Sequence, residues 1–272
     1  MSERPEDIQK RLTGVDEIGQ VVGALRAIAA GQVGAAHAAI DAVSAFAGTI
    51  EQALSSVAAP GRLPGPRRGA GLLLVVGAAQ GFSGSYSARI ADAARGEMRD
   101  KPGLLVLGQR TIEMLEEQDL PILWSADMPG HPAAIPELAS RVTDTLVRLS
   151  LDRPGPVRAV VGTVETGQAL QARTLFPPAP GPHPASATSN SRPLTTMPAA
   201  DLVTGLLEEA LFAAVVHALV DGMAAEAQAR VEAMARAQSN LRARRTDIQR
   251  QYQQARQEQM TTEMIELVVS RL

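Results

Sequence analysis

The sequence predicts a small α/β domain inserted between two halves of a helical rod, and three observations predict it. Residues 6–59 and 199–272 contain no proline, and both carry apolar residues at the three- and four-residue spacing of an α-helix. The segment between them alternates short apolar runs with helix-like stretches, which is typical of βαβ units. Aromatic residues make up only 3% of the chain, a composition that suits helices packed closely through small side chains.

Residues 1–59 are predicted to form one coiled-coil helix, because apolar residues recur in steps of three and four over about seven heptads. The predicted seam consists of Ile8, Leu12, Val15, Ile18, Val22, Leu25, Ala29, Val33, Ala36, Ile40, Val43, Ala47, Ile50, Leu54 and Val57. Six glycines interrupt this helix. Each costs up to about 1 kcal/mol relative to alanine, so we expect the helix to need a partner.

Residues 199–272 are predicted to form a second coiled-coil helix, roughly 110 Å long at 1.5 Å per residue. No compact domain of this size contains such a length, so the expected partner is the helix at the other terminus, running antiparallel. Its apolar stripe is dense at first, thins through an arginine-rich middle and strengthens again from Met264 to Val268.

Residues 70–176 are predicted to form a Rossmann-like α/β domain with a mainly parallel sheet. We expect strands at 72–76, 104–108, 121–123, 157–165 and 168–176, and helices near 85–99, 110–119 and 136–150. The last two strands read as a pair joined by a short turn. Residues 177–198 hold seven prolines, which indicates a loop or disordered linker.

The stretch "GAAQGFSG" at 77–84 has two readings, a phosphate-binding loop or a plain turn between strand and helix. Gly81 and Gly84 supply part of the G-x-G-x-x-G dinucleotide fingerprint, but Ala79 stands where the first glycine is needed. A P-loop needs a lysine, which is absent here, and Ser85 replaces the last glycine of a nucleophile elbow. The motif therefore favours a plain turn, and no cofactor is expected.

Composition and residue spacing argue against several other functions. The net charge of −3 gives no overall attraction for nucleic acid, and the absence of cysteine excludes disulfides and thiolate metal sites. The charged start of the chain does not read as a secretory signal, and no apolar run of about 18 residues indicates a membrane span. None of the histidines has metal-ligand spacing or neighbours an acid as a catalytic triad would need: His37, His131, His183 and His217.

Residues 230–270 carry a specific motif, with the order and spacing of "AM..A..N" followed by "RQ..IT.E..EIV". It comprises Ala233, Met234, Ala237, Asn240, Tyr252, Arg256, Gln257, Thr261, Glu263, Glu266 and Val268. This stretch closely resembles the C-terminal helix of the gamma subunit of rotary F-type ATP synthases. The first helix is similar to that family's opening helix, matching at Ile8, Leu12, Val15, Ile18, Val22, Ala24, Leu25, Ile28 and Ala29.

Departures from that family indicate a divergent member, such as a subunit of a second, alternative ATPase. The family's Asp-Arg-Gly-Leu-Cys-Gly turn corresponds to "AAQGFSG", with Gly81 and Gly84 retained but the Asp, Arg and Cys replaced. Most of the basic charge of the family's first helix is also missing. By resemblance, the two glycines belong to a scaffold turn.

The resemblance implies a non-catalytic rotor that couples ion flow to ATP synthesis or hydrolysis. Its expected partners are the alpha and beta subunits, as an alternating hexamer, the epsilon subunit and the membrane c-ring, at the cytoplasmic face of a bacterial plasma membrane. The implied hexamer contacts are Leu25, Arg26, Arg256, Gln257, Thr261 and Glu263. The implied bearing tip is Ile265, Leu267, Val268 and Val269. Two alternatives stay open: a small-molecule-binding α/β protein with coiled-coil dimerisation arms, and a plain structural coiled coil.

Overall fold

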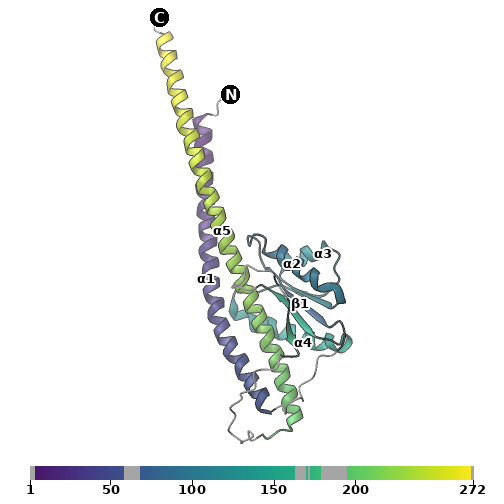
Figure 1. Cartoon of the computed structure of the whole chain (residues 1–272). Coiled ribbons are helices and arrows are strands. Elements are labelled where there is room, and N and C mark those ends of the chain that lie inside the picture. The colour runs from purple at the N-terminus through teal and green to yellow at the C-terminus, as the bar shows by residue number, and fades with distance from the viewer. Residues whose placement is uncertain (1–3, 58–67, 163–169, 171, 179–194, 271–272) are drawn as a thin grey trace. The chain divides into compact units, whose positions relative to one another are not determined.

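The computed structural model describes residues 4–57, 68–162, 170, 172–178 and 195–270 (Figure 1). The chain divides into two compact units, one formed by residues 1–29 and 230–272 and the other by residues 30–229. Two long helices, α1 (Pro5–Val57) and α5 (Ala199–Val269), each contribute residues to both units. The fold is thus a pair of long terminal helices with an inserted α/β domain, as the sequence predicts.

The unit of residues 30–229 contains a five-stranded mixed sheet in the order β3-β2-β1-β4-β5. Its strands are β1 (Leu72–Val76), β2 (Gly103–Leu107), β3 (Ile122–Ala126), β4 (Val157–Val161) and β5 (Ala172–Phe176). The first four are parallel, and β5 pairs antiparallel to β4, which confirms the predicted strand pair. The turn predicted between β4 and β5 lies outside the described residues, as does most of the 177–198 segment.

Helices cover both faces of this sheet. They are α2 (Tyr86–Gly96), η1 (Glu97–Asp100), α3 (Gln109–Glu116), η2 (Pro132–Ala134) and α4 (Ile135–Asp152). Leu72, Leu74 and Val76 pack in one cluster with α4 and the first half of α5, whereas Leu73 and Val75 pack with α2 and α3. Because both faces are covered, β1 is apolar throughout and not alternating.

In the unit of residues 1–29 and 230–272, α1 and α5 run antiparallel (Figure 1). Arg245 Nε donates to Asp16 Oδ1 at 2.7 Å, and Arg26 Nη1 donates to Gln238 Oε1 at 3.1 Å. Ile8 and Ile248 are buried in the same unit. The two terminal helices therefore pack against each other, which confirms the predicted pairing.

The predicted seam is correct except at Ile18, which is 54% exposed. A strict heptad from Ile8 continues through Val15, and its second seam position after Leu12 falls on residue 19. Gly19 occupies that position and is half-buried. Ile18 lies one residue away, so it turns about 100° from the partner helix.

By length and hydropathy alone, α1 and α5 each hold an 18-residue window apolar enough to cross a membrane. The windows have mean hydropathies of 1.3 and 1.7 and are 11% and 39% buried. Core helices of soluble proteins also pass this test, so the windows are weak evidence for a membrane span. The expectation of no direct span stays a prediction.

Candidate functional site

The C-terminal edge of the sheet is where an α/β protein of this topology would bind a ligand. The chain passes from β1 to β2 and β3 on one side, then returns to place β4 on the other side of β1. Ligands of open α/β sheets bind beyond the carboxyl ends of the strands at such a switch point. The segment that follows β1 at this edge is the glycine-containing turn, so the phosphate-loop question can be decided from its hydrogen bonds.

Glu226 of α5 occupies this turn. Its Oε2 accepts a hydrogen bond from the backbone N–H of Ala79 at 3.0 Å, and its Oε1 accepts one from Gln80 at 3.1 Å. The carboxylate is 5% exposed. Two backbone amides that a phosphate-binding loop would offer to an anion are therefore already bound to an anion of the same chain.

The backbone of α5 lies directly against the sheet beside Glu226. A Cβ placed on Gly222 would lie 2.4 Å from Val76 Cγ1, so only glycine fits there without movement. Tyr86 Oη donates to the Gly222 carbonyl at 3.4 Å. Burial, reinforced by the negative charge of Glu226, raises the pKa of the Tyr86 hydroxyl well above its usual value, so the phenol remains a neutral donor. These contacts hold α5 against the carboxyl edge of the sheet. We call the contact surface around Glu226, Gly222 and Tyr86 the seat of α5.

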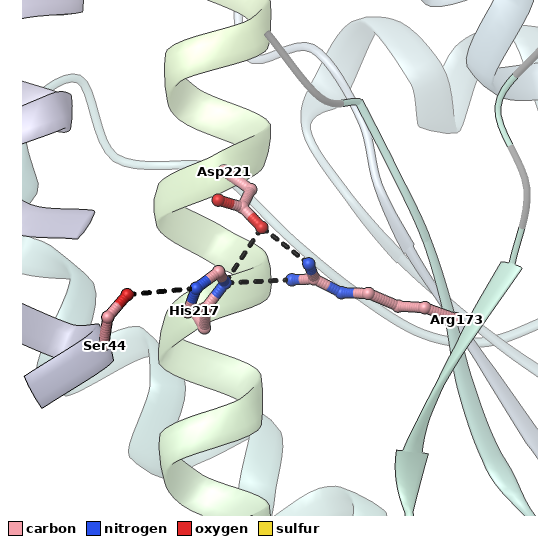
Figure 2. A network of polar contacts seen from close by, with 4 residues as sticks. All are labelled: Ser44, Arg173, His217 and Asp221. Carbon is pink, nitrogen blue, oxygen red and sulfur yellow. Dashed lines mark hydrogen bonds and ion pairs between the residues drawn. The ribbon is translucent and has the colours of Figure 1, made fainter. Parts of the chain in front are cut away.

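A polar network joins α1, β5 and α5 near this seat (Figure 2). Asp221 Oδ2 accepts from Arg173 Nη1 at 2.6 Å and lies 2.9 Å from His217 Nδ1. Ser44 Oγ lies 3.5 Å from His217 Nε2. Burial raises the pKa of the Asp221 carboxyl, but the hydrogen bond with His217 and the charge of Arg173 outweigh it and hold that pKa below its usual value.

A histidine and an acid lie together in this network, whereas the sequence predicts only that no histidine neighbours an acid as a catalytic triad would need. His217 and Asp221 are four residues apart, a spacing that places two side chains on one face of a helix and that the sequence already contained. The order serine, histidine, aspartate also resembles a hydrolytic triad. Ser44, however, lies inside α1, where backbone N–H groups are committed to helical hydrogen bonds and cannot form an oxyanion hole. We therefore interpret the network as a structural link between α1, β5 and α5.

The structure separates the predicted hexamer contacts into two groups. Arg256, Gln257, Thr261 and Glu263 all lie on the exposed end of α5. Leu25 is half-buried, and Arg26 binds Gln238. From residue 238 to residue 256, α5 rises roughly 27 Å at 1.5 Å per residue. The two groups would therefore meet different parts of any partner.

The predicted bearing tip forms the last turns of the same helix. Ile265, Leu267, Val268 and Val269 are 58%, 63%, 62% and 65% exposed. Within the described part of the chain, all residues from Arg256 to Ser270 are exposed. This end of α5 extends past the start of α1, so no helix of the described residues lies beside it (Figure 1).

The two predicted turn glycines behave differently. Gly84 has φ +62°, a backbone conformation that favours glycine, whereas the space beside Gly81 is open. Between them, Phe82 has φ +65° and is largely exposed, a feature that the sequence did not signal.

Comparison with known proteins identifies relatives of nearly the whole chain. A family whose description is ATP synthase matches residues 4–270. The ATP synthase gamma chain of Sinorhizobium fredii is 24% identical over 97% of both chains. That of Campylobacter fetus is 48% identical over 52 residues, a match that covers only 19% of this chain and 18% of the relative.

A solved structure shares the fold. The central stalk and c-ring structure of the Tetrahymena thermophila mitochondrial ATP synthase contains a chain that matches with a TM-score of 0.59 and 18% identity. The match covers 80% of this chain and 99% of that one. Since the family match spans nearly the whole sequence, this chain belongs to the ATP synthase gamma-chain family, the non-catalytic rotor subunits of the central stalk of F-type ATP synthases.

Proposed function

We propose that the exposed end of α5 turns inside an alternating hexamer of alpha and beta subunits and couples ion flow to ATP synthesis or hydrolysis. A single chain within a threefold ring presents a different side to each catalytic site. As the shaft rotates, each site therefore meets a new surface, and its affinity for nucleotide changes with the angle. The shaft itself carries out no chemistry.

The observation that carries this proposal is the uncovered apolar surface at the end of α5. Met260 and Met264 are about half exposed or more, as are the four residues of the bearing tip. Soluble proteins rarely leave contiguous apolar surface uncovered, and an unsupported helix end is unstable in water. A partner that covers this segment explains both features.

The arrangement of this surface favours a ring over a single partner helix. Consecutive helical residues point 100° apart, so Leu267, Val268 and Val269 face three different directions. One partner helix would cover a single stripe. An apolar sleeve around the helix covers every direction and offers few directional bonds that would resist rotation.

Polar contacts with the hexamer are proposed at two levels. Arg256, Gln257, Thr261 and Glu263 would exchange charge-assisted hydrogen bonds with loops of the ring just below the tip. Leu25 and Arg26 would contact a beta subunit lower on the shaft. There Leu25 adjoins Ile18, Val21 and Ile28, which are all exposed apolar residues on α1 at helical spacing.

The inserted domain is proposed to contact the epsilon subunit and the membrane c-ring, at the cytoplasmic face of a bacterial plasma membrane. In this interpretation Gly81 and Gly84 shape a scaffold turn. The occupation of the Ala79 and Gln80 amides by Glu226 supports a scaffold role, because a phosphate at this point would have to displace a carboxylate.

The test is to assemble the chain with the alpha and beta subunits and the membrane sector of its own organism. We expect one copy per three alpha and three beta subunits, and loss of coupled ATP synthesis when the chain is omitted. In this complex, Arg256→Ala with Gln257→Ala should lower ATP synthesis while leaving the thermal midpoint of the isolated chain unchanged.

A matched control lies one heptad earlier on the same face, at Gln249→Ala with Arg250→Ala. We expect this control to lower ATP synthesis less than the Arg256 and Gln257 double variant does. Unchanged ATP synthesis by the Arg256 and Gln257 double variant would remove these residues from the contact surface. A chain that elutes alone as a dimer, with the hexamer indifferent to it, would overturn the rotor proposal.

A further inference from the structure

A groove in the unit of residues 30–229 lies between the outer face of α4 and the first part of α5. Its volume is about 560 Å³, and the spacing of its α4 residues places them on one helix face. The lining side chains come from Ser140, Thr143, Asp144, Val147, Arg148 and Leu151 of α4, and from Glu208, Glu209 and Phe212 of α5. The opposite face of α4 packs on the sheet, so the groove is separate from the seat of α5.

The groove exposes apolar surface that the chain does not cover. Leu151 is 78% exposed and Val147 is 42% exposed, and they lie one turn apart on α4. Phe212 lies half-buried on the α5 side. Single exposed apolar residues are common on protein surfaces, but two exposed ones that line one groove with a half-buried phenylalanine indicate a binding surface.

The charges of the groove are unbalanced. Asp144, Glu208 and Glu209 contribute three negative charges, and Arg148 contributes the only positive charge among the lining residues. Among the described residues, none of the three carboxylates forms an ion pair. The groove therefore combines apolar side chains with three exposed carboxylates, here called the acidic rim, that form no ion pair with the described residues.

We propose that this groove binds an amphipathic helix with basic flanks, contributed by another subunit of the complex. A helix-in-groove contact places a row of apolar side chains, three and four residues apart, against an apolar floor. Here Leu151, Val147 and Phe212 would receive that row, and lysines or arginines beside it would pair with the acidic rim. This inference rests on the proposed function, because it takes the partner from the same assembly.

The absence of cysteine in the chain allows a single thiol to probe the groove. Leu151→Cys, labelled with a benzophenone maleimide before assembly, places a photoreactive group beside the apolar side chains of the groove. Leu123→Cys, on the exposed part of β3, is the matched control. After illumination of the assembled complex, mass spectrometry identifies the crosslinked peptide, and ATPase activity is measured on the same sample.

We expect a peptide of one other subunit with apolar residues at helical spacing and basic residues beside them, in several-fold higher yield than from the control. Removing the rim charges with Asp144→Asn, Glu208→Gln and Glu209→Gln should lower that yield up to about tenfold, because three exposed ion pairs are lost. Arg148→Gln, which removes the opposite charge from the same groove, should maintain or raise it.

A yield equal to the control, a crosslink to lipid or to a second copy of this chain, or a peptide without basic residues would overturn the proposal. Yields that do not respond to the rim substitutions would do the same. If the complex assembles with full ATPase activity, such a result refutes the groove alone. If the chain does not enter the complex, the rotor proposal fails, and the groove proposal fails with it.

Discussion

Residues 211–229 and residues 256–269 belong to the same helix, yet the chain covers the first segment and leaves the second exposed. The first packs its apolar side chains on the sheet and inserts Glu226 into the turn after β1. The second has fewer apolar residues, six among its 14, and all of its residues are exposed in the described chain. Helix propensity does not separate them, since both are continuous α-helix. The two segments differ in what covers their apolar side chains. The chain itself covers residues 211–229, and we propose that a partner subunit covers residues 256–269.

The strongest way to sharpen this comparison is one substitution made at both segments. Leu219 is fully buried, so Leu219→Ala should lower the free energy of unfolding by about 3 kcal/mol, through lost burial and the cavity left behind. Leu267 is 63% exposed, so Leu267→Ala should change it by less than about 0.5 kcal/mol. Urea unfolding followed by circular dichroism measures both. Equal losses would mean that the isolated chain covers its own tip.

The second prediction concerns the seat of α5. Glu226→Ala leaves the amides of Ala79 and Gln80 without their acceptor, and should destabilise the chain by about 2 kcal/mol. Hydrogen exchange at those two amides should accelerate together. Glu226→Gln keeps one acceptor oxygen and should cost less. Glu266→Ala, at the exposed end, is the control and should leave both measurements unchanged. Faster exchange at the Ala79 and Gln80 amides in this control would contradict a purely local effect of Glu226.

The third prediction is a pH dependence of the covered segment. The folded state holds the pKa of Asp221 below its unfolded value, so the network's contribution is complete above the usual carboxyl pKa of about 4. It is lost as the pH falls through the lower, folded value. Asp221→Asn should reduce stability at neutral pH by about 1 kcal/mol and flatten the acid limb of the stability curve. A variant with an unchanged acid limb would exclude Asp221 as its source.

The sequence alone predicted both long helices because their apolar spacing is a local property that residues carry whether or not a partner is present. The seam was mispredicted only at Ile18, where Gly19 occupies the heptad position and its apolar neighbour was taken for the seam residue. His217 and Asp221 were predictable in principle, since a four-residue step joins them within one helix.

Other parts of the site could not be predicted from spacing. Glu226 binds amides almost 150 residues earlier in the chain, and no local pattern distinguishes it from a solvated helix acid. The same holds for Gly222, whose need for glycine comes from Val76 on a distant strand. The partners of the predicted hexamer contacts belong to other chains, so neither the spacing nor the fold of this chain can test those contacts.

The smallest expected effect separates the glycines that the packing requires from those it does not. A Cβ on Gly31 of α1 would meet no atom within 4 Å, so Gly31→Ala should stabilise the chain by about 0.5–1 kcal/mol through helix propensity. Gly222→Ala gains the same propensity, but its Cβ would lie 2.4 Å from Val76 Cγ1, and overpacking typically costs about 1–3 kcal/mol. We therefore expect a net loss of about 1 kcal/mol, and thermal midpoints that move in opposite directions. If both variants gained stability, α5 would have to shift on the sheet at little cost, and the contrast between its seated and exposed segments would be one of degree.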